Sequence, residues 1–166
     1  MFDTFIDPAL RLAAAVIAGM AIGLNRDLHG KPTGVRTLGL VGLGAALVTY
    51  GAMHAVTNGG SVYDNLDASS RAVQGLIQGL LTGIGFIGAG VILHDTSTLK
   101  VHGLTTAAAV WVTAAIGLIC GLGEWYLLAI AGCLVFGLLL FGGPLERYFH
   151  RRLGGDRSEP PDSARE

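Results

Sequence analysis

The segment that decides the fold is AVQGLIQGLLTGIGFIGAGVIL, residues 72–93. It includes no Asp, Glu, Lys or Arg over its whole length. A helix of about 20 apolar residues is long enough to cross the hydrocarbon core of a bilayer. The segment therefore predicts a transmembrane helix, and four of its glycines lie between positions 83 and 90.

Other apolar runs lie on both sides of this segment. A shorter one, residues 9–24, contains Arg11, whose side chain we expect to reach the headgroups from near one end of a helix. Three further runs without charged residues cover positions 37–63, 103–123 and 125–145, and each is long enough to span a bilayer. The sequence thus predicts an all-α integral membrane bundle of five transmembrane helices, near residues 9–24, 37–56, 71–93, 104–121 and 125–143.

The composition argues against a soluble enzyme. Apolar residues make up 51% of the chain and charged residues only 14%, whereas soluble domains carry about a quarter charged. So little polar surface cannot cover four long apolar runs in water. The net charge of −1 supplies no field that would attract nucleic acid. We therefore expect a lipid bilayer around the chain, no nucleic-acid partner, no enzyme activity and no cofactor.

Lysine and arginine in the short loops predict the orientation, because cytoplasmic loops are enriched in them. The first loop holds Arg26, Lys31 and Arg36, and the third holds Lys100. The second loop, residues 57–70, holds neither residue type. This alternation predicts an N-terminus outside the cell and a C-terminus inside it.

The ends of the chain differ from its apolar middle. We expect residues 1–145 to form the transmembrane domain and residues 146–166 to form a short basic, then disordered, cytoplasmic tail. The start has no basic stretch, so it does not predict a cleavable signal peptide. Cys120 and Cys133 lie too far apart in depth for a disulfide, and we expect two free thiols.

Glycines recur at four-residue spacing in several predicted helices. Small residues at this spacing let helix backbones approach closely in lipid. The dense run at positions 83–90 also fits a helix that is broken at membrane depth, as in the ion sites of transporters. The candidates for helix packing are Gly19, Gly23, Gly75, Gly79, Gly117 and Gly121.

A polar stripe accompanies the glycines of the third helix. Arg71, Gln74, Gln78 and Thr82 are spaced by three, four and four residues, which places them on one helical face. Such groups either form interhelical hydrogen bonds or line a solute pathway. The sequence leaves both readings open.

Three blocks combine glycine with basic or polar residues. They are IGLNR at 22–26 with KPTGVRT at 31–37, GIGFIGAGVIL at 83–93, and GLTTAA at 103–108 followed by Trp111. In this order they resemble the MgtC/SapB family of bacterial membrane proteins. Asn25 stands where the family commonly has Glu. Residue Arg71 lies about one helical turn further from the glycine block than the arginine usual in the family.

The resemblance implies a multi-pass protein of the bacterial inner membrane. It further implies a role in magnesium homeostasis and growth in low magnesium, and a link to restraint of ATP synthase. Family members linked to virulence have a soluble C-terminal domain, where this chain has a short tail. The family-motif and functional candidates are Arg26, Lys31, Pro32, Gly34, Arg36, Gln78, Gly83, Gly85, Phe86, Gly88, Gly90, Gly103, Thr105, Thr106 and Trp111.

Two classes of function fit these observations. One is a non-enzymatic regulator that binds a membrane protein partner or a second copy of itself. The alternative is a small transporter or channel subunit for a divalent cation such as Mg²⁺. Mg²⁺ prefers carboxylate ligands, and the predicted helix interiors contain no Asp or Glu, so the sequence assigns no metal ligands.

The motif blocks also predict a local arrangement. We expect residues 83–90 and 103–106 to form one unit at the cytoplasmic side, beside the basic residues of the first loop. Thr105 and Thr106 are expected to cap the fourth helix. Arg36 is expected to meet the carbonyls at the end of the third helix, where the helix dipole favours a cation.

Overall fold

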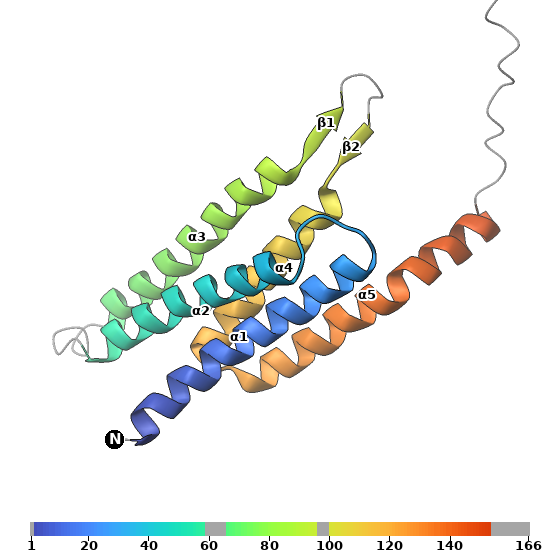
Figure 1. Cartoon of the computed structure of the whole chain (residues 1–166). Helices are drawn as coiled ribbons and strands as arrows, with labels where there is room; N and C mark the ends of the chain where they lie inside the picture. Colours follow the sequence, from blue (N-terminus) through green and yellow to red (C-terminus); the bar gives the residue numbers. More distant parts are fainter. Residues whose placement is uncertain (1, 59–65, 96–99, 154–166) are drawn as a thin grey trace, which may run out of the picture. The chain divides into compact units, whose positions relative to one another are not determined.

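A computed structural model describes residues 2–58, 66–95 and 100–153 of the chain. Five helices of the described part are long and apolar enough to cross a membrane, so the predicted all-helical membrane fold is confirmed to that extent. The elements are, in order, α1 (Phe2–Leu28), α2 (Val35–Asn58), α3 (Leu66–Val91), β1 (Leu93–Asp95), β2 (Lys100–His102), α4 (Leu104–Leu122) and α5 (Trp125–Leu153) (Figure 1).

Most helices are longer than the apolar runs that predicted them. α1 covers Phe2–Leu28 rather than residues 9–24, and α3 begins at Leu66, inside the predicted second loop. α5 continues to Leu153, so the basic start of the predicted tail is helical, while residues 154–166 lie outside the described residues. Backbone hydrogen bonding does not end where hydrophobicity ends, because a helix remains stable in the headgroup region.

A two-stranded hairpin lies in the predicted third loop. β1 and β2 are antiparallel, with Leu93 opposite His102 and Asp95 opposite Lys100 (Figure 1). Such short strands cannot show an alternation of polar and apolar residues. The hairpin could therefore not be recognised from the sequence.

The glycine-dense part of α3 is a continuous helix. α3 runs from Leu66 to Val91 as one α-helix, so the alternative of a helix broken at positions 83–90 is wrong. Each glycine weakens a helix by up to about 1 kcal/mol relative to alanine. The backbone of a membrane helix nevertheless keeps its internal hydrogen bonds, because hydrocarbon offers no substitute for them.

The chain divides into two compact units, Met1–Gly132 and Cys133–Glu166, with the boundary inside α5. Within the first unit, α1, α2 and α4 pack against one another, and α3 packs against α4 and more sparsely against α2. Both cysteines are free thiols, as predicted. The core between α1, α2 and α4 consists mainly of small and branched side chains, including Ala15, Ile22, Leu38, Ala46, Val110 and Ala114.

Glycines allow the close packing of α1, α2 and α4. A Cβ added at Gly19 or at Gly117 would overlap a carbonyl oxygen of α2. At Gly121 it would lie 2.8 Å from the carbonyl oxygen of Ala46. At Gly23 it would lie 2.6 Å from the Cα of Val35. These four predicted packing positions therefore lie where one backbone meets another.

The glycines of α3 are in a different environment. A Cβ added at Gly75 or Gly79 would meet no other atom of the described chain within 4 Å. The expected close packing at these two positions therefore does not occur within the described chain. The same open space surrounds Gly83, and the neighbouring Gln74 and Gln78 are exposed.

Candidate functional site

The first unit has two ends, which we name after their arginines. At the Arg26 end, α1 and α3 finish and α2 and α4 begin. At the Arg11 end, α1 begins and α4 finishes. The three motif blocks meet at the Arg26 end, so it is the candidate site.

The loop between α1 and α2 is tightly turned at this end. The amides of His29 and Lys31 donate to the carbonyl of Arg26 at 3.1 and 3.0 Å, which closes the last turn of α1. Gly30 and Thr33 both have positive φ angles, of 61° and 70°. A β-branched residue rarely adopts this conformation, so the loop holds Thr33 there against its own preference.

Arg26 joins this loop to the start of α4. Its Nη2 donates to the carbonyl of Pro32 at 2.8 Å, and its Nε lies 3.2 Å from the carbonyl of Thr33. Across the bundle, Nη1 donates to the carbonyl of Thr105 at 3.3 Å, and Nη2 donates to the hydroxyl of Thr106. We call these five residues the Arg26 clamp.

Neutral oxygens surround the charge of Arg26. The residue is only 5% exposed, and none of the acceptors in the Arg26 clamp is a carboxylate. Arg26 lies in the last turn of α1, where the negative end of the helix dipole favours a cation. Since protein oxygens already occupy most of its N–H donors, the guanidinium serves to hold structure together rather than to receive a ligand.

Asp27 holds the beginning of α2. Its Oδ2 accepts a hydrogen bond from the amide of Val35 at 3.0 Å. A Cβ at Gly34 would overlap this carboxylate. The glycine of the predicted motif is thus required because the Asp27 side chain occupies the space beside it. Asp27 was not among the predicted site residues, so this role was missed.

The start of α4 is capped differently from the prediction. Its N-cap residue is Gly103, with φ of 91° and no side-chain hydrogen bond. A Cβ at Gly103 would overlap the carbonyl of Val91, the last residue of α3. The expectation that Thr105 and Thr106 cap this helix is therefore wrong, because Thr106 accepts from Arg26 instead.

The other two basic residues of the loop do not join the site. Lys31 and Arg36 are both exposed. Arg36 was expected to meet the carbonyls at the end of α3, and no such contact is present among the described residues. Arg26 is instead the basic residue of the motif that donates to carbonyls. These carbonyls belong to the loop and to α4, and not to the end of α3.

The remaining candidates lie outside the Arg26 clamp. Gly88 is buried, with the Ala107 side chain 3.7 Å from the position of an added Cβ. Phe86 is 83% exposed and Trp111 is 46% exposed. Gly83, Gly85 and Gly90 face open space. Gln78 lies nearer the start of α3, away from the Arg26 end. The structure therefore brings together only part of the predicted set: Arg26, Pro32, Gly103, Thr105 and Thr106, with Gly34 next to Asp27.

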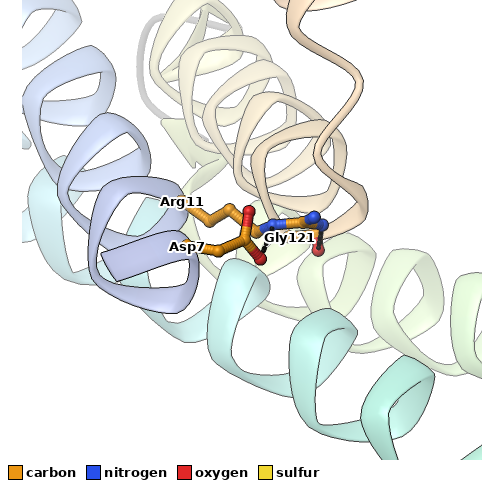
Figure 2. A network of polar contacts seen from close by, with 3 residues as sticks. All are labelled: Asp7, Arg11 and Gly121. Carbon is orange, nitrogen blue, oxygen red and sulfur yellow. Dashed lines mark hydrogen bonds and ion pairs between the residues drawn. The ribbon is translucent and has the colours of Figure 1, made fainter. Parts of the chain in front are cut away.

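A second polar network lies at the Arg11 end. Arg11 donates from Nη1 to the carbonyl of Gly121 at 3.1 Å, and its Nε lies 2.8 Å from Oδ2 of Asp7 (Figure 2). Its Cζ also lies 5.8 Å from the centroid of the Tyr50 ring. Arg11 was expected to reach the headgroups; its guanidinium contacts the carbonyl of Gly121, near the end of α4. The feature of the sequence that pointed to this network was an arginine within an otherwise apolar run.

Metal ligands do not gather in the described part of the chain. No three His, Cys, Asp or Glu side chains there are close enough to hold one ion. The buried polar side chains of the core are otherwise satisfied locally. Thr49 and Thr113, for example, donate to carbonyls one turn earlier in their own helices.

Comparisons with known proteins agree with the arrangement of the motif blocks. Residues 12–148 match the model of the MgtC family. Protein SrpB of Synechococcus elongatus is 42% identical over 125 residues, which are 72% of this chain and 65% of that protein. A protein of Escherichia coli named "Putative magnesium transporter YhiD" is 42% identical over 132 residues, 79% of this chain and 58% of that protein.

A further relative matches at lower identity. Protein MgtC of Salmonella typhimurium is 36% identical over 116 residues, 70% of this chain and 44% of that protein. The matched part of this chain therefore covers 44 to 65% of the length of these relatives. No solved structure matches it. The family match covers both the loop after α1 and the start of α4, which Arg26 joins, and the chain belongs to the MgtC family.

Proposed function

We propose that this protein is a non-enzymatic regulator that binds a second membrane protein through the open face of α3. The observation that carries the proposal is the environment of Gln74 and Gln78. Both side chains are exposed on a helix that is long and apolar enough to span a membrane. Neither makes a hydrogen bond within the described chain.

Polar amides in hydrocarbon are costly unless they find partners. Leaving an amide without a hydrogen bond costs roughly 2–7 kcal/mol, depending on the reference medium. Gln74 and Gln78 lie next to Gly75 and Gly79, which would let another helix approach closely. A transmembrane helix of a partner would supply hydrogen-bonding groups and would cover the glycines at the same time.

The family relationship suggests the biological process and the membrane in which this regulator acts. The relatives include MgtC and a protein named "Putative magnesium transporter YhiD", so we infer a role in growth at low magnesium. The loop charges favour the bacterial inner membrane with the Arg26 end in the cytoplasm. ATP synthase is the partner that the family resemblance suggests.

The partner is sought by comparing two glycine variants. Gly79→Leu would push a partner helix away from α3. Gly44→Leu makes the same change at a glycine of α2 that also faces open space. The variants are expressed in a bacterial strain that lacks its own MgtC-family protein. We expect Gly79→Leu to abolish growth in low magnesium. We also expect that a pull-down with this variant no longer recovers the stoichiometric membrane partner. Gly44→Leu should keep both. Equal behaviour of the two variants, at equal abundance, would contradict the proposal.

A cleft favours a second candidate, a magnesium channel or transporter subunit. It has a volume of about 730 Å³ and lies between α2 and α3, lined by Met53, Val56, Val73, Gln74, Ile77 and Gln78. Its polar side chains are the amides of Gln74 and Gln78 and the hydroxyl of Ser70 rather than carboxylates, which suits weak passage of a hydrated ion better than tight binding.

Flux measurements separate the two candidates. Purified protein in proteoliposomes is tested with Mg²⁺ and H⁺ indicators, beside a Gln78→Leu variant. Saturable Mg²⁺ uptake that is lost in the variant would support the transporter. No uptake above empty liposomes, together with recovery of a partner, would support the regulator.

A further inference from the structure

We propose that α4 is built to pivot about the Arg26 clamp and to open at its other end, where Asp7, Arg11 and Gly121 form a weaker contact that we call the Arg11 latch. The inference concerns how the first unit moves and goes beyond binding of a partner. It follows from the spacing of the two arginines and from the difference between their surroundings.

The two arginines hold α4 at both ends. Arg11 and Arg26 are separated along α1 by the same number of positions as their partners Gly121 and Thr106 are along α4. The helices run in opposite directions, and at the rise of an α-helix this separation corresponds to about 22 Å. One helix therefore fixes the axial position of the other at two points.

The two attachments differ in strength. In the Arg26 clamp, Arg26 is buried and donates to oxygens of four residues from the loop and from α4. In the Arg11 latch, one hydrogen bond reaches α4, and the Arg11 and Asp7 side chains are 23% and 51% exposed. The Nε of Arg11 is enclosed and touches Asp7 as an ion pair without a well-directed hydrogen bond. Ion pairs near the surface contribute little to stability, and this pair is partly exposed, so this end is the one that opens.

The end of α4 itself is suited to such an opening. Gly123 adopts φ of 79° and closes the helix through bonds from its amide to the carbonyls of Ile119 and Cys120. A Cβ at Gly123 would overlap the Arg11 guanidinium, so Arg11 lies directly against this turn. The carbonyl of Gly121 can therefore lose Arg11 while the turn keeps its own hydrogen bonds.

Movement of this end would have a consequence elsewhere in the first unit. α3 packs against α4, so a tilt of α4 would be transmitted to α3. The latch would thereby couple the Arg11 end to the face that carries Gln74 and Gln78.

A native thiol reports whether the latch is open. Cys120 precedes Gly121 and is 1% exposed, while Cys133 is exposed and is removed by Cys133→Ser. In this background, the full chain in native membranes is treated with N-ethylmaleimide. We expect Arg11→Met to raise the reaction rate of Cys120 about tenfold, as loss of a single hydrogen bond of the latch would do. Arg11→Lys should restore most of the protection.

Two comparisons keep the test sharp. Asp7→Asn should also raise the rate, but should add nothing in the Arg11→Met background, because Asp7 acts through Arg11. A second reporter, Val110→Cys with Cys120→Ala, probes a buried position one turn from Thr106. Its rate should not change with Arg11→Met. An unchanged rate at Cys120 would overturn the proposal. An equal rise at both positions would also overturn it, since the whole bundle would then be looser.

Discussion

At the scale of single residues, the partners of the two arginines could not be read from the sequence. The motif blocks identified Arg26, Thr106 and Gly34 as candidates, and all three lie at the Arg26 end. The expected roles were partly wrong, since Arg36 is exposed and Thr106 caps nothing. Arg26 and Thr106 are far apart in the chain, so their contact depends on how three helices are set against one another. No local pattern encodes that relation.

Thr106 and Thr105 provide a matched pair of substitutions. Thr106→Val removes the buried hydroxyl that accepts from Arg26 and keeps the shape of the side chain. We expect the free energy of unfolding in detergent to fall by about 1–3 kcal/mol, because a charged donor loses its partner. The measurement is thermal denaturation followed by circular dichroism.

Thr105→Val serves as the control for this prediction. Thr105 contributes only its backbone carbonyl to Arg26, and its own side chain is exposed. Its melting temperature should stay close to that of the parent. If the two variants melt together, the hydroxyl of Thr106 has no special role.

At the scale of the elements, the existence of each helix was predictable and its neighbours were not. Four long uncharged runs and one shorter run that contains Arg11 identified the five helices, because hydrocarbon thickness sets a minimum length. Four-residue glycine spacing was correctly associated with close packing on α1 and α4. The same spacing on α3 marks a face that no described part of the chain covers. The spacing of glycines predicts which face of a helix is smooth. It does not predict which other helix, if any, packs against that face.

Gly117 tests the close contact of α2 and α4. In Gly117→Ala the new Cβ would overlap the carbonyl of Gly42. We expect a loss of about 1–3 kcal/mol of unfolding free energy from overpacking, measured as a lower melting temperature in detergent.

The matched change is Gly44→Ala on α2, where an added Cβ meets open space. It should be neutral or stabilising by up to about 1 kcal/mol, since alanine favours a helix over glycine. Lower stability of Gly44→Ala than of Gly117→Ala would contradict the packing described above.

At the scale of the whole molecule, the sequence predicts an orientation in the membrane. The loop between α1 and α2 carries Lys31 and the hairpin of β1 and β2 carries Lys100, whereas the only charged residue in the turn between α4 and α5 is Glu124. This distribution of charge predicts that the Arg26 end faces the cytoplasm and the Arg11 end faces outwards.

Labelling in intact cells tests the orientation. In a background with Cys120→Ala and Cys133→Ser, a membrane-impermeant maleimide should modify Glu124→Cys and spare Lys31→Cys. Both positions are exposed, so a difference in labelling reports the side of the membrane. Lysis should make both reactive. The opposite pattern in intact cells would reverse the orientation.

The pairing of two arginines on one helix with two sites on another also constrains how the chain can change in length. One residue inserted into α1 between Arg11 and Arg26 would rotate one arginine by about 100° relative to the other. Only one of them could then still face α4. Deletions and insertions between these positions are therefore forbidden unless α4 changes by the same amount. The number of residues in this part of the chain is therefore as strictly determined as the identity of the arginines themselves.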